Sequence, residues 1–420
     1  MRERLPREVW ILLGAIFLIA VGYGVISPVL PSLAASFNVG VTAAAFVVSA
    51  FSVVRLAFAP AGGWLVAKLS EQPVYVTGLI LAAAATAACA WASSYWQLLL
   101  FRSLGGIGSV MFTVSAQTLV LRLTPVGLRG RVSGMWATSF LLGNIAGPLV
   151  GGVVANVSTR FPFVVYGLAT FGAAVFSWWF LRKSPLAAPS ATRDLPELTV
   201  RVALRNRAYI AALFSSFAYG WSVIGVRFAL VPLFVVLELH EGETLVGLAL
   251  SAFAVGTASF LMIAGRLADR RGRKPVAIAG LAVLTVGSLA MGFAPSVPLF
   301  MVASLVTGIG SGLLNPGHSA AVADVIGVGV RGSAVLAAFQ ATADLGAIVG
   351  PLAAGAIADA WSYQGAFAVT GVVSLLSLLV WLKAPETGKA PARSEGQSTA
   401  RNQAEPGSEV CGPAADTSSS

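Results

Sequence analysis

The sequence predicts an all-α membrane protein with twelve transmembrane helices, arranged as two six-helix bundles related by a pseudo-two-fold axis. Three observations support this prediction. Of the 420 residues, 57% are hydrophobic and only 10% are charged, whereas soluble proteins carry roughly 25% charged residues. Apolar runs of about 20 residues, enough to cross a bilayer, recur along the chain. The two halves also share residues at a nearly constant spacing.

Each apolar run is long enough to be a membrane-spanning helix. The runs cover roughly residues 9–30, 43–66, 74–93, 97–121, 132–156, 162–181, 208–236, 244–266, 275–294, 298–323, 333–358 and 364–382. They are too long and too uniformly apolar for the strands of a membrane barrel, which alternate. The first run is also too long for the apolar core of a cleavable signal, so it is expected to remain as a membrane span.

Basic residues between the runs predict the orientation. If the spans alternate in direction, the basic clusters fall on one side, and the other side holds Arg160 and an acidic loop with Glu238, Glu241 and Glu243. Lysine and arginine favour cytoplasmic loops. We therefore expect a multi-pass protein of the inner (cytoplasmic) membrane with both termini in the cytoplasm.

The polar segments divide the chain into four parts. We expect an N-terminal six-helix bundle over residues 1–181, a cytoplasmic linker over 182–207, a C-terminal six-helix bundle over 208–385 and a disordered cytoplasmic tail over 386–420. The linker is mostly polar and contains Pro185, Pro189 and Pro196, and the tail has the composition of a disordered segment.

The two halves form an internal repeat. At a spacing of 202 residues, Ala50-Phe51 matches Ala252-Phe253, Gly106-Ile107-Gly108 matches Gly308-Ile309-Gly310, and Arg129-Gly130 matches Arg331-Gly332. Gly147-Pro148-Leu149 then matches Gly350-Pro351-Leu352, one residue further on. Parallel six-helix repeats are used by secondary transporters that alternate access to a site near the membrane midplane.

The loop after the eighth run reads Gly265-Arg-Leu-Ala-Asp-Arg-Arg-Gly-Arg-Lys-Pro275. A glycine at Gly265 would allow close helix approach, and Asp269 is suited to accept hydrogen bonds from a neighbouring helix N-terminus. Arg270, Gly272 and Arg273 complete a segment that resembles the cytoplasmic loop signature of the major facilitator superfamily. The first-half copy, residues 63–73, departs from that pattern, with Ala67, Ser70 and Glu71 at three of its positions.

Two further segments carry the same resemblance, which spans about residues 9–385. In the fourth run, Arg102 precedes the glycine-rich turn Gly105-Gly106-Ile107-Gly108. The fifth run contains Gly143, Gly147, Pro148, Gly151 and Gly152, a match to the signature of the family's antiporters and drug exporters. Glycines at this spacing form a packing groove and Pro148 bends the helix. The resemblance implies the major facilitator fold, and these residues are expected to contribute to gating.

Four charged residues lie well inside apolar runs: Arg55, Arg102, Arg227 and Asp344. Intramembrane charges usually face a cavity and mark a pathway. Asp344 and Arg102 are therefore proton-coupling candidates, the latter also by resemblance to proton-coupled family members. Two alternatives remain open: Asp344 as a structural residue that pairs with Arg227 or caps a helix, and Arg102 as a side chain that reaches the outer membrane interface.

The resemblance implies a central cavity lined mainly by the first, fourth, seventh and tenth helices. Its polar and aromatic candidates are Tyr23, Arg55, Gln117, Asn144, Trp221, Arg227, Asn315 and Gln340, although packing would explain each of them singly. Arg55 and Arg227 favour an anionic or zwitterionic substrate over a bulky cation.

The leading functional hypothesis is proton-coupled export of amphipathic small molecules such as antibiotics or secondary metabolites. The alternative is proton-coupled import of a nutrient such as a sugar or organic acid. We find no catalytic set, cofactor motif or metal-ligand spacing, so we expect no enzyme activity, no cofactor and no metal. The expected partners are a small-molecule substrate, protons and the lipid bilayer. We expect no nucleic-acid binding, because the basic residues lie in separate loops, and we expect a monomer.

Overall fold

A computed structural model describes residues 6–124, 128–181, 198–327 and 332–387 of this chain. Within these ranges the regular structure is helical and contains no strand. Twelve helices of the described chain are long and apolar enough to cross a membrane, which confirms the predicted number. The predicted tail beyond residue 387 and the linker residues 182–197 lie outside the described residues.

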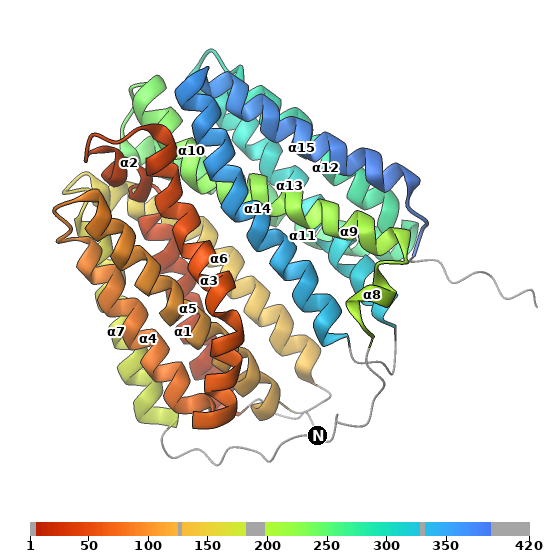
Figure 1. The fold of residues 1–420 in the computed structure, drawn as a ribbon, viewed down its shortest axis with the longest axis horizontal. Helices are drawn as coiled ribbons and strands as arrows, with labels where there is room; N and C mark the ends of the chain where they lie inside the picture. Colours follow the sequence, from red (N-terminus) through yellow and green to blue (C-terminus); the bar gives the residue numbers. More distant parts are fainter. Residues whose placement is uncertain (1–5, 125–127, 182–197, 328–331, 388–420) are drawn as a thin grey trace, which may run out of the picture.

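The N-terminal bundle (Figure 1) consists of α1 (Arg7–Ile26), the short α2 (Leu30–Ala35), α3 (Val41–Leu69), α4 (Glu71–Cys89), α5 (Tyr95–Leu123), α6 (Arg129–Ala155) and α7 (Phe161–Leu181). A short helix, α8 (Val200–Ala203), precedes the second bundle. The C-terminal bundle consists of α9 (Arg207–Tyr219), η3 (Gly220–Val226), α10 (Arg227–Leu233), η4 (Phe234–Glu238), α11 (Glu243–Arg271), α12 (Arg273–Gly292), α13 (Val297–Ile326), α14 (Ser333–Ala360) and α15 (Tyr363–Lys383).

The seventh membrane span differs from a simple helix. It is one continuous rod in which two α-helical segments, α9 and α10, alternate with two π-helical segments, η3 and η4. A π turn contains an extra residue, and such turns occur frequently at functional sites. The extra residues change which side chains share a face, so sequence spacing alone does not predict the orientation of residues in this span.

The internal repeat is visible in the helix contacts. In the N-terminal bundle, a Cβ added at Gly108 would lie 2.6 Å from the carbonyl oxygen of Gly78, and α4 and α5 pack closely there. In the C-terminal bundle, a Cβ at Gly310 would lie 3.0 Å from the carbonyl oxygen of Gly280, between α12 and α13. Glycines at matched positions therefore bring matched helices together, as small residues do in membrane proteins.

The glycines of the fifth span pack α6 against α1. A Cβ at Gly147 would lie 2.4 Å from the carbonyl oxygen of Val21, and one at Gly151 would lie 2.1 Å from the carbonyl oxygen of Val25. Gly143 faces Ala20 in the same way. The predicted packing groove is thus present, and it stabilises the interior of one bundle.

Two helix pairs join the bundles: α3 with α14, and α11 with α6. The Ser49 hydroxyl donates to the carbonyl oxygen of Ile348 (3.0 Å), and the Ser251 hydroxyl donates to the carbonyl oxygen of Ile145 (2.9 Å). Ser251 is the repeat partner of Ser49, and Ile348 is the repeat partner of Ile145. The two bundles therefore meet through the same contact made twice, as a pseudo-two-fold axis requires.

Candidate functional site

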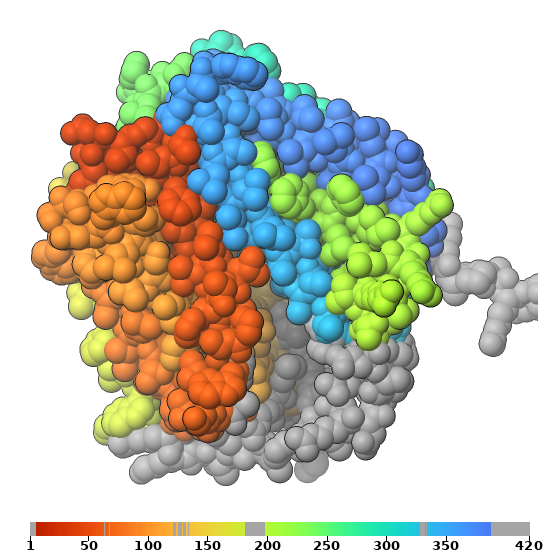
Figure 2. Space-filling model, viewed as in Figure 1, coloured from red at the N-terminus to blue at the C-terminus, as the bar shows by residue number. Residues whose placement is uncertain are grey.

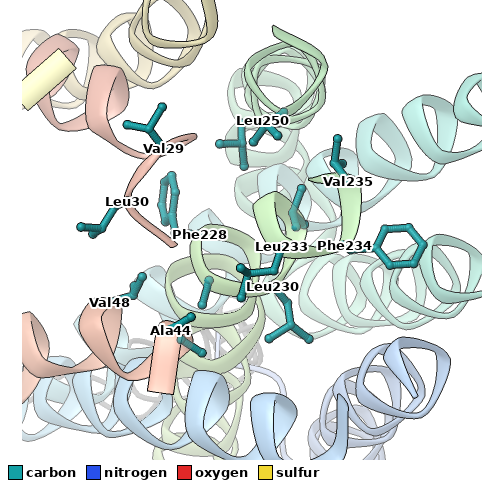
Figure 3. Packing of buried hydrophobic residues seen from close by; sticks show 14 of the residues in the cluster. Val29, Leu30, Ala44, Val48, Phe228, Leu230, Leu233, Phe234, Val235 and Leu250 are labelled. Atoms are coloured by element: carbon teal, nitrogen blue, oxygen red, sulfur yellow. The ribbon is translucent and has the colours of Figure 1, made fainter. Parts of the chain in front are cut away.

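The contacts between the bundles are concentrated toward one end of the molecule. We use the term seal for the cross-bundle contacts made by residues 41–49 of α3, 145–156 of α6, 244–251 of α11 and 348–359 of α14. An apolar cluster lies beside it, and Val29 and Leu30 of the N-terminal bundle belong to it together with Phe228 of the C-terminal bundle (Figure 3). Ala44 and Val48 of the N-terminal bundle join Leu230, Leu233 and Leu250 of the other bundle in the same cluster.

The closest approach of the two bundles involves glycines. A Cβ at Gly247 would lie 2.3 Å from the carbonyl oxygen of Pro148, and one at Gly152 would lie 2.8 Å from the carbonyl oxygen of Glu243. Gly152, predicted to take part in gating, therefore contacts the opposite bundle directly. Any larger side chain at these positions would push α6 and α11 apart.

A cavity of about 620 Å³ begins where the seal ends. On α3 the last sealing hydrogen bond is at Ser49 and the lining begins at Phe51; on α11 these residues are Ser251 and Phe253. On α6 and α14 the order along the chain is reversed, because these helices run in the opposite direction. There the lining ends at Asn144 and Asp344.

We call the opposite end of the molecule the basic end, because Arg7, Lys68, Arg207, Arg271 and Lys383 lie there at or near helix termini. From the seal the cavity lining extends toward this end, to Leu261 on α11 and Gln340 on α14. Figure 2 shows α3 and α14 close together at the top of the view and separated lower down. The bundles are thus joined at the end farther from the basic residues and diverge toward the basic end.

Eight of the ten sequence-predicted cavity and coupling residues line this cavity. These are Tyr23, Arg55, Arg102, Asn144, Arg227, Asn315, Gln340 and Asp344. They come from α1, α3, α5, α6, α10, α13 and α14, so both bundles contribute. The volume is in the range of sites for drug-sized molecules, roughly 300–1,000 Å³.

Gln117 and Trp221 do not line the cavity. Gln117 lies on an exposed part of α5. Trp221 is buried inside the C-terminal bundle, where its indole Nε1 donates to the hydroxyl of Thr370 at 3.2 Å, and a Cβ at Gly350 would contact its ring. Both placements correct the prediction. Trp221 packs against neighbouring helices, as buried aromatic residues with a polar handle usually do.

Arg102 lines the cavity and is buried, so the alternative of a side chain that extends outward to the membrane interface does not fit this structure. Its side chain is buried, with 4% of the residue exposed. Its guanidinium Cζ lies 4.2 Å from the ring centroid of Phe51 and 5.6 Å from that of Tyr23. These distances are typical of cation–π contacts. Arg102 is therefore held in place by aromatic rings in the wall of the cavity.

Arg227 has a similar environment in the other bundle. Its Cζ lies 4.1 Å from the ring centroid of Phe228 and 4.3 Å from that of Phe253. Its Nη2 donates to Oδ1 of Asn144 across the bundle interface at 3.5 Å. Tyr23 contacts Phe228 edge to face, so the aromatic residues of both bundles meet beside the arginines.

Asp344 lies on the lining of α14 and is half-buried. It interacts electrostatically with Arg55 of α3. Among the ion pairs between described residues, none joins Asp344 to Arg227, so the predicted alternative of a structural pair with Arg227 does not hold here. Among the described residues, the Asp344 carboxylate therefore forms no salt bridge, and Arg55 is its electrostatic neighbour.

The sequence did not indicate the hydroxyl groups of the lining. Tyr219 accepts a hydrogen bond from Nδ2 of Asn315 at 3.2 Å. Apart from Tyr219 and the predicted Tyr23, the hydroxyl-bearing residues of the lining are Ser52, Thr86, Ser109, Thr113, Tyr166, Thr170, Thr257 and Ser311. Such residues are common in packed membrane helices, where they usually bond to their own backbone. The residue type therefore does not distinguish cavity-lining hydroxyl groups from the others, and only the helix packing shows which of them face the cavity.

The loop signature adopts a different arrangement from the one predicted. Nothing lies within 4 Å of a Cβ at Gly265, so there is no close helix approach there. Asp269 pairs with Arg273 at 2.5 Å, and Arg273 also bonds to Asp324 at 3.2 Å. Arg270 is exposed.

Glu386, and not Asp269, caps the N-terminus of α12. Its carboxylate accepts hydrogen bonds from the backbone N–H of Arg273 (2.6 Å) and of Lys274 (3.1 Å). Gly272 has φ of 106°, and a Cβ there would collide with the Glu386 carboxylate. Glycine is therefore required at this position of the signature on both conformational and steric grounds.

Comparison with known proteins finds matches over most of the chain. The model of the Major Facilitator Superfamily matches residues 12–240 and 212–413. The chain is 27% identical over 378 residues to the class G tetracycline resistance protein of Vibrio anguillarum, covering 87% of this chain and 94% of that one. It is 26% identical over 225 residues to the quinolone resistance protein NorA of Staphylococcus aureus, covering 53% and 58%.

A solved structure has the same fold. It is a bacterial homologue of the human lysosomal transporter Spinster in an inward-facing, unoccupied conformation, with a TM-score of 0.72 and 14% sequence identity. The likeness covers 90% of this chain and 96% of that one.

Proposed function

This chain belongs to the major facilitator superfamily of membrane transporters, and we propose that it exports amphipathic small molecules across the inner membrane in exchange for protons. The family membership and the twelve apolar helices make it a multi-pass membrane transporter. Export, proton coupling and the cytoplasmic location of both termini are parts of the proposal. The resistance proteins among its relatives support export of drug-like molecules.

The boundary between the seal and the cavity is the observation that carries the proposal. On four helices from two bundles, sealing contacts stop and cavity lining begins within a few residues. A site placed in this way opens to one side of the membrane only. If the basic end is cytoplasmic, as the positive-inside rule indicates, the arrangement is the one that takes up substrate from the cytoplasm.

Alternation between two states follows from the repeat. Each bundle is internally held by close glycine contacts, such as Gly147 with Val21 in α1. The seal combines hydrogen bonds that are duplicated by the pseudo-symmetry with close glycine contacts between α6 and α11. Rocking of two rigid bundles would break the seal and bring the basic ends together, as in transporters built from parallel repeats.

The loop signature fits this transition. In the state described here, Asp269 pairs within its own bundle with Arg273, and Gly265 has open space beside it. In the opposite state, the ends of α3 and α11 that now diverge would approach other helices, and Gly265 would then allow close contact. We therefore propose that Gly265 and Asp269 act in closing the basic end and not in the state described here.

Asp344 is our proposed proton-coupling residue, and Arg55 its electrostatic neighbour. A low-dielectric site disfavours the charged form of a carboxylate, whereas a nearby arginine stabilises it. A carboxylate balanced between these effects is suited to bind and release a proton as its access changes sides. Arg102 stays a second candidate, because it lines the same cavity.

Accumulation of tetracycline and of a fluoroquinolone in a bacterial host without its own efflux pumps tests this function. Cells that express the protein should accumulate less drug than cells with empty vector, and an uncoupler should abolish the difference. Higher accumulation in the expressing cells would instead support the importer hypothesis. Equal accumulation of both drugs with and without the protein would contradict export of this class.

A further inference from the structure

Arg102 and Arg227 line the cavity from opposite bundles. Arg102 on α5 lies against Phe51, and Arg227 on α10 lies against Phe253 and Phe228. Phe51 and Phe253 are repeat partners, at the same position of α3 and α11. The repeat thus supplies an aromatic support on each side. Arg227 lies against Phe253, and Arg102 lies against Phe51, with Arg55 farther from the same ring at 5.9 Å.

These guanidinium groups have donors without acceptors. The two residues are only 4% and 7% exposed, and the Nε atom of each is buried without a hydrogen-bond partner among the described residues. The contact of Arg227 with Asn144 is long, at 3.5 Å. Buried cations in a membrane protein are costly unless they are paired, and a guanidinium offers five donors in a planar fork that matches a carboxylate. A bound anionic group would supply the missing acceptors.

The net charge of the lining also favours a bound anionic group. It contains three arginines and one aspartate among the described residues, so it carries a net charge of +2. The aromatic side chains Tyr23, Phe51, Phe228 and Tyr166 also line the cavity. The site is therefore suited to an aromatic molecule that carries at least one negative group.

Proton exchange adds a second requirement to the substrate. A purely anionic substrate would bind more tightly once Asp344 is protonated, because the lining would then be more positive. The proton and the anion would then cross together in one direction, which contradicts exchange. Exchange requires a substrate that loses a favourable contact when Asp344 is protonated, and a basic amine near the Asp344 carboxylate has this property.

Resting on the proposed proton exchange, we infer that the substrates are aromatic zwitterions. The anionic group binds between Arg102 and Arg227, and the amine faces Asp344. The proton and the amine compete for the same carboxylate, so protonation from the far side releases the substrate. This assigns separate roles to the two ends of one substrate.

The surroundings of Asp344 do not offer a competing carboxylate within the described residues. The titratable and charged groups that line the cavity with it are Arg55 of α3, Arg102 of α5, Arg227 of α10, Tyr23 of α1, Tyr166 of α7 and Tyr219 of α9. Outside the lining, the helices packed against α14 carry His318, Lys68, Arg201, Arg207, Tyr209, Asp324, Tyr363 and Lys383. Of these, the one carboxylate, Asp324, is paired with Arg273. His318 is buried against Phe339 and Tyr219 and does not line the cavity.

Three dyes with one tricyclic scaffold test the inference. Rhodamine 110 carries a carboxylate and a cationic ring system, rhodamine 123 is its methyl ester and is only cationic, and fluorescein has the same carboxylate on an anionic ring system. Binding to the purified full-length protein is measured by fluorescence anisotropy at several pH values. We expect rhodamine 110 to bind at least about tenfold more tightly than rhodamine 123, because the ester removes a charge-assisted pairing.

Variants separate the two ends of the substrate. Arg227→Gln and Arg102→Gln should each weaken binding of rhodamine 110 and of fluorescein at least about tenfold without weakening that of rhodamine 123. Lysine at either position should restore part of the affinity. Asp344→Asn should weaken the binding of rhodamine 110 and leave the affinity for fluorescein unchanged or higher. In this variant, acidification should no longer weaken the binding of rhodamine 110. Arg160→Gln, at the sealed end and outside the cavity, is the matched control.

The outcomes distinguish the substrate class from the proposed function. Equal affinity for rhodamine 110 and rhodamine 123, no binding of any of the dyes, or unchanged affinities in both arginine variants would overturn the inference. Transport is measured separately, in proteoliposomes with an imposed pH gradient. Selective binding of rhodamine 110 without gradient-driven transport would uphold the zwitterion site and contradict the proposed export. Gradient-driven transport of rhodamine 123 alone would uphold the proposed export and contradict the zwitterion site.

Discussion

Asp359 at the end of α14 caps the start of α3 in the opposite bundle, through the backbone N–H of Thr42 (2.8 Å) and the Thr42 hydroxyl (2.5 Å). The second carboxylate oxygen accepts from the N–H of Val41 at 2.8 Å. The repeat-related position holds Asn156, which bonds only to the side chain of Thr244, at 3.1 Å. The seal therefore has one charged corner and one neutral corner, built on equivalent positions.

Removal of the charged corner should favour opening at the sealed end. Asp359→Ala removes a carboxylate from a helix N-terminus, which costs about 0.5–1 kcal/mol at an exposed site. This corresponds to an increase of about two- to fivefold in the open population. The increase is measured as labelling of Ser52→Cys, in a background lacking Cys89 and Cys411, by an impermeant maleimide added outside intact cells.

The neutral corner provides the comparison for that experiment. Asn156→Ala removes only the longer side-chain contact with Thr244, so its labelling should rise less than that of Asp359→Ala. An equal rise in the two variants would show that the charge of Asp359 adds nothing to the seal.

A methyl group at the closest point of the seal should open it further. Gly247→Ala places a Cβ only 2.3 Å from the carbonyl oxygen of Pro148. Overpacking of this kind costs about 1–3 kcal/mol. The same cysteine-labelling assay should show a larger increase than for Asp359→Ala. Gly172→Ala in α7, where nothing lies within 4 Å of the added Cβ, should leave labelling at the wild-type level.

Within the N-terminal bundle, two glycines of α6 should respond in opposite ways. Gly147→Ala would contact the Val21 carbonyl oxygen at 2.4 Å, whereas nothing lies within 4 Å of a Cβ at Gly134. Gly147→Ala should therefore lower the thermal unfolding midpoint in detergent. Gly134→Ala should raise it slightly, because alanine is favoured over glycine in a helix by up to about 1 kcal/mol. A stable Gly147→Ala variant would contradict the close α1–α6 packing.

Loss of the cavity carboxylate should separate substrate movement from proton movement. Asp344→Asn keeps the shape of the side chain but cannot take up a proton. In proteoliposomes, an imposed pH gradient should no longer drive net transport, while exchange of labelled for unlabelled substrate should continue. Net transport that responds to the gradient as in the wild type would exclude Asp344 as the coupling residue.

The sequence predicted which helices carry cavity-lining charges better than it predicted the surroundings of those side chains. Arg55, Arg102, Arg227 and Asp344 were identified because charge inside an apolar run is expensive, and all four line the cavity. Trp221 and Gln117 were identified by residue type alone, and neither lines the cavity. Trp221 of η3 packs inside its own bundle, and Gln117 of α5 is exposed. The capping of α3 by Asp359 left no local signal, since its partner lies more than 300 residues away.

The sequence by itself determined the number, length and order of the membrane helices and the division into two related halves. Lipid imposes these features directly, because each crossing needs a long apolar run and each charge inside it stands out. Only the tertiary structure decided which end is sealed, which of the many small and hydroxyl-bearing residues face the cavity, and that Glu386 caps α12 in place of Asp269. These depend on how apolar helices of nearly uniform surface rotate and tilt against one another, which is set by close contacts such as Gly247 with Pro148 and not by local sequence pattern.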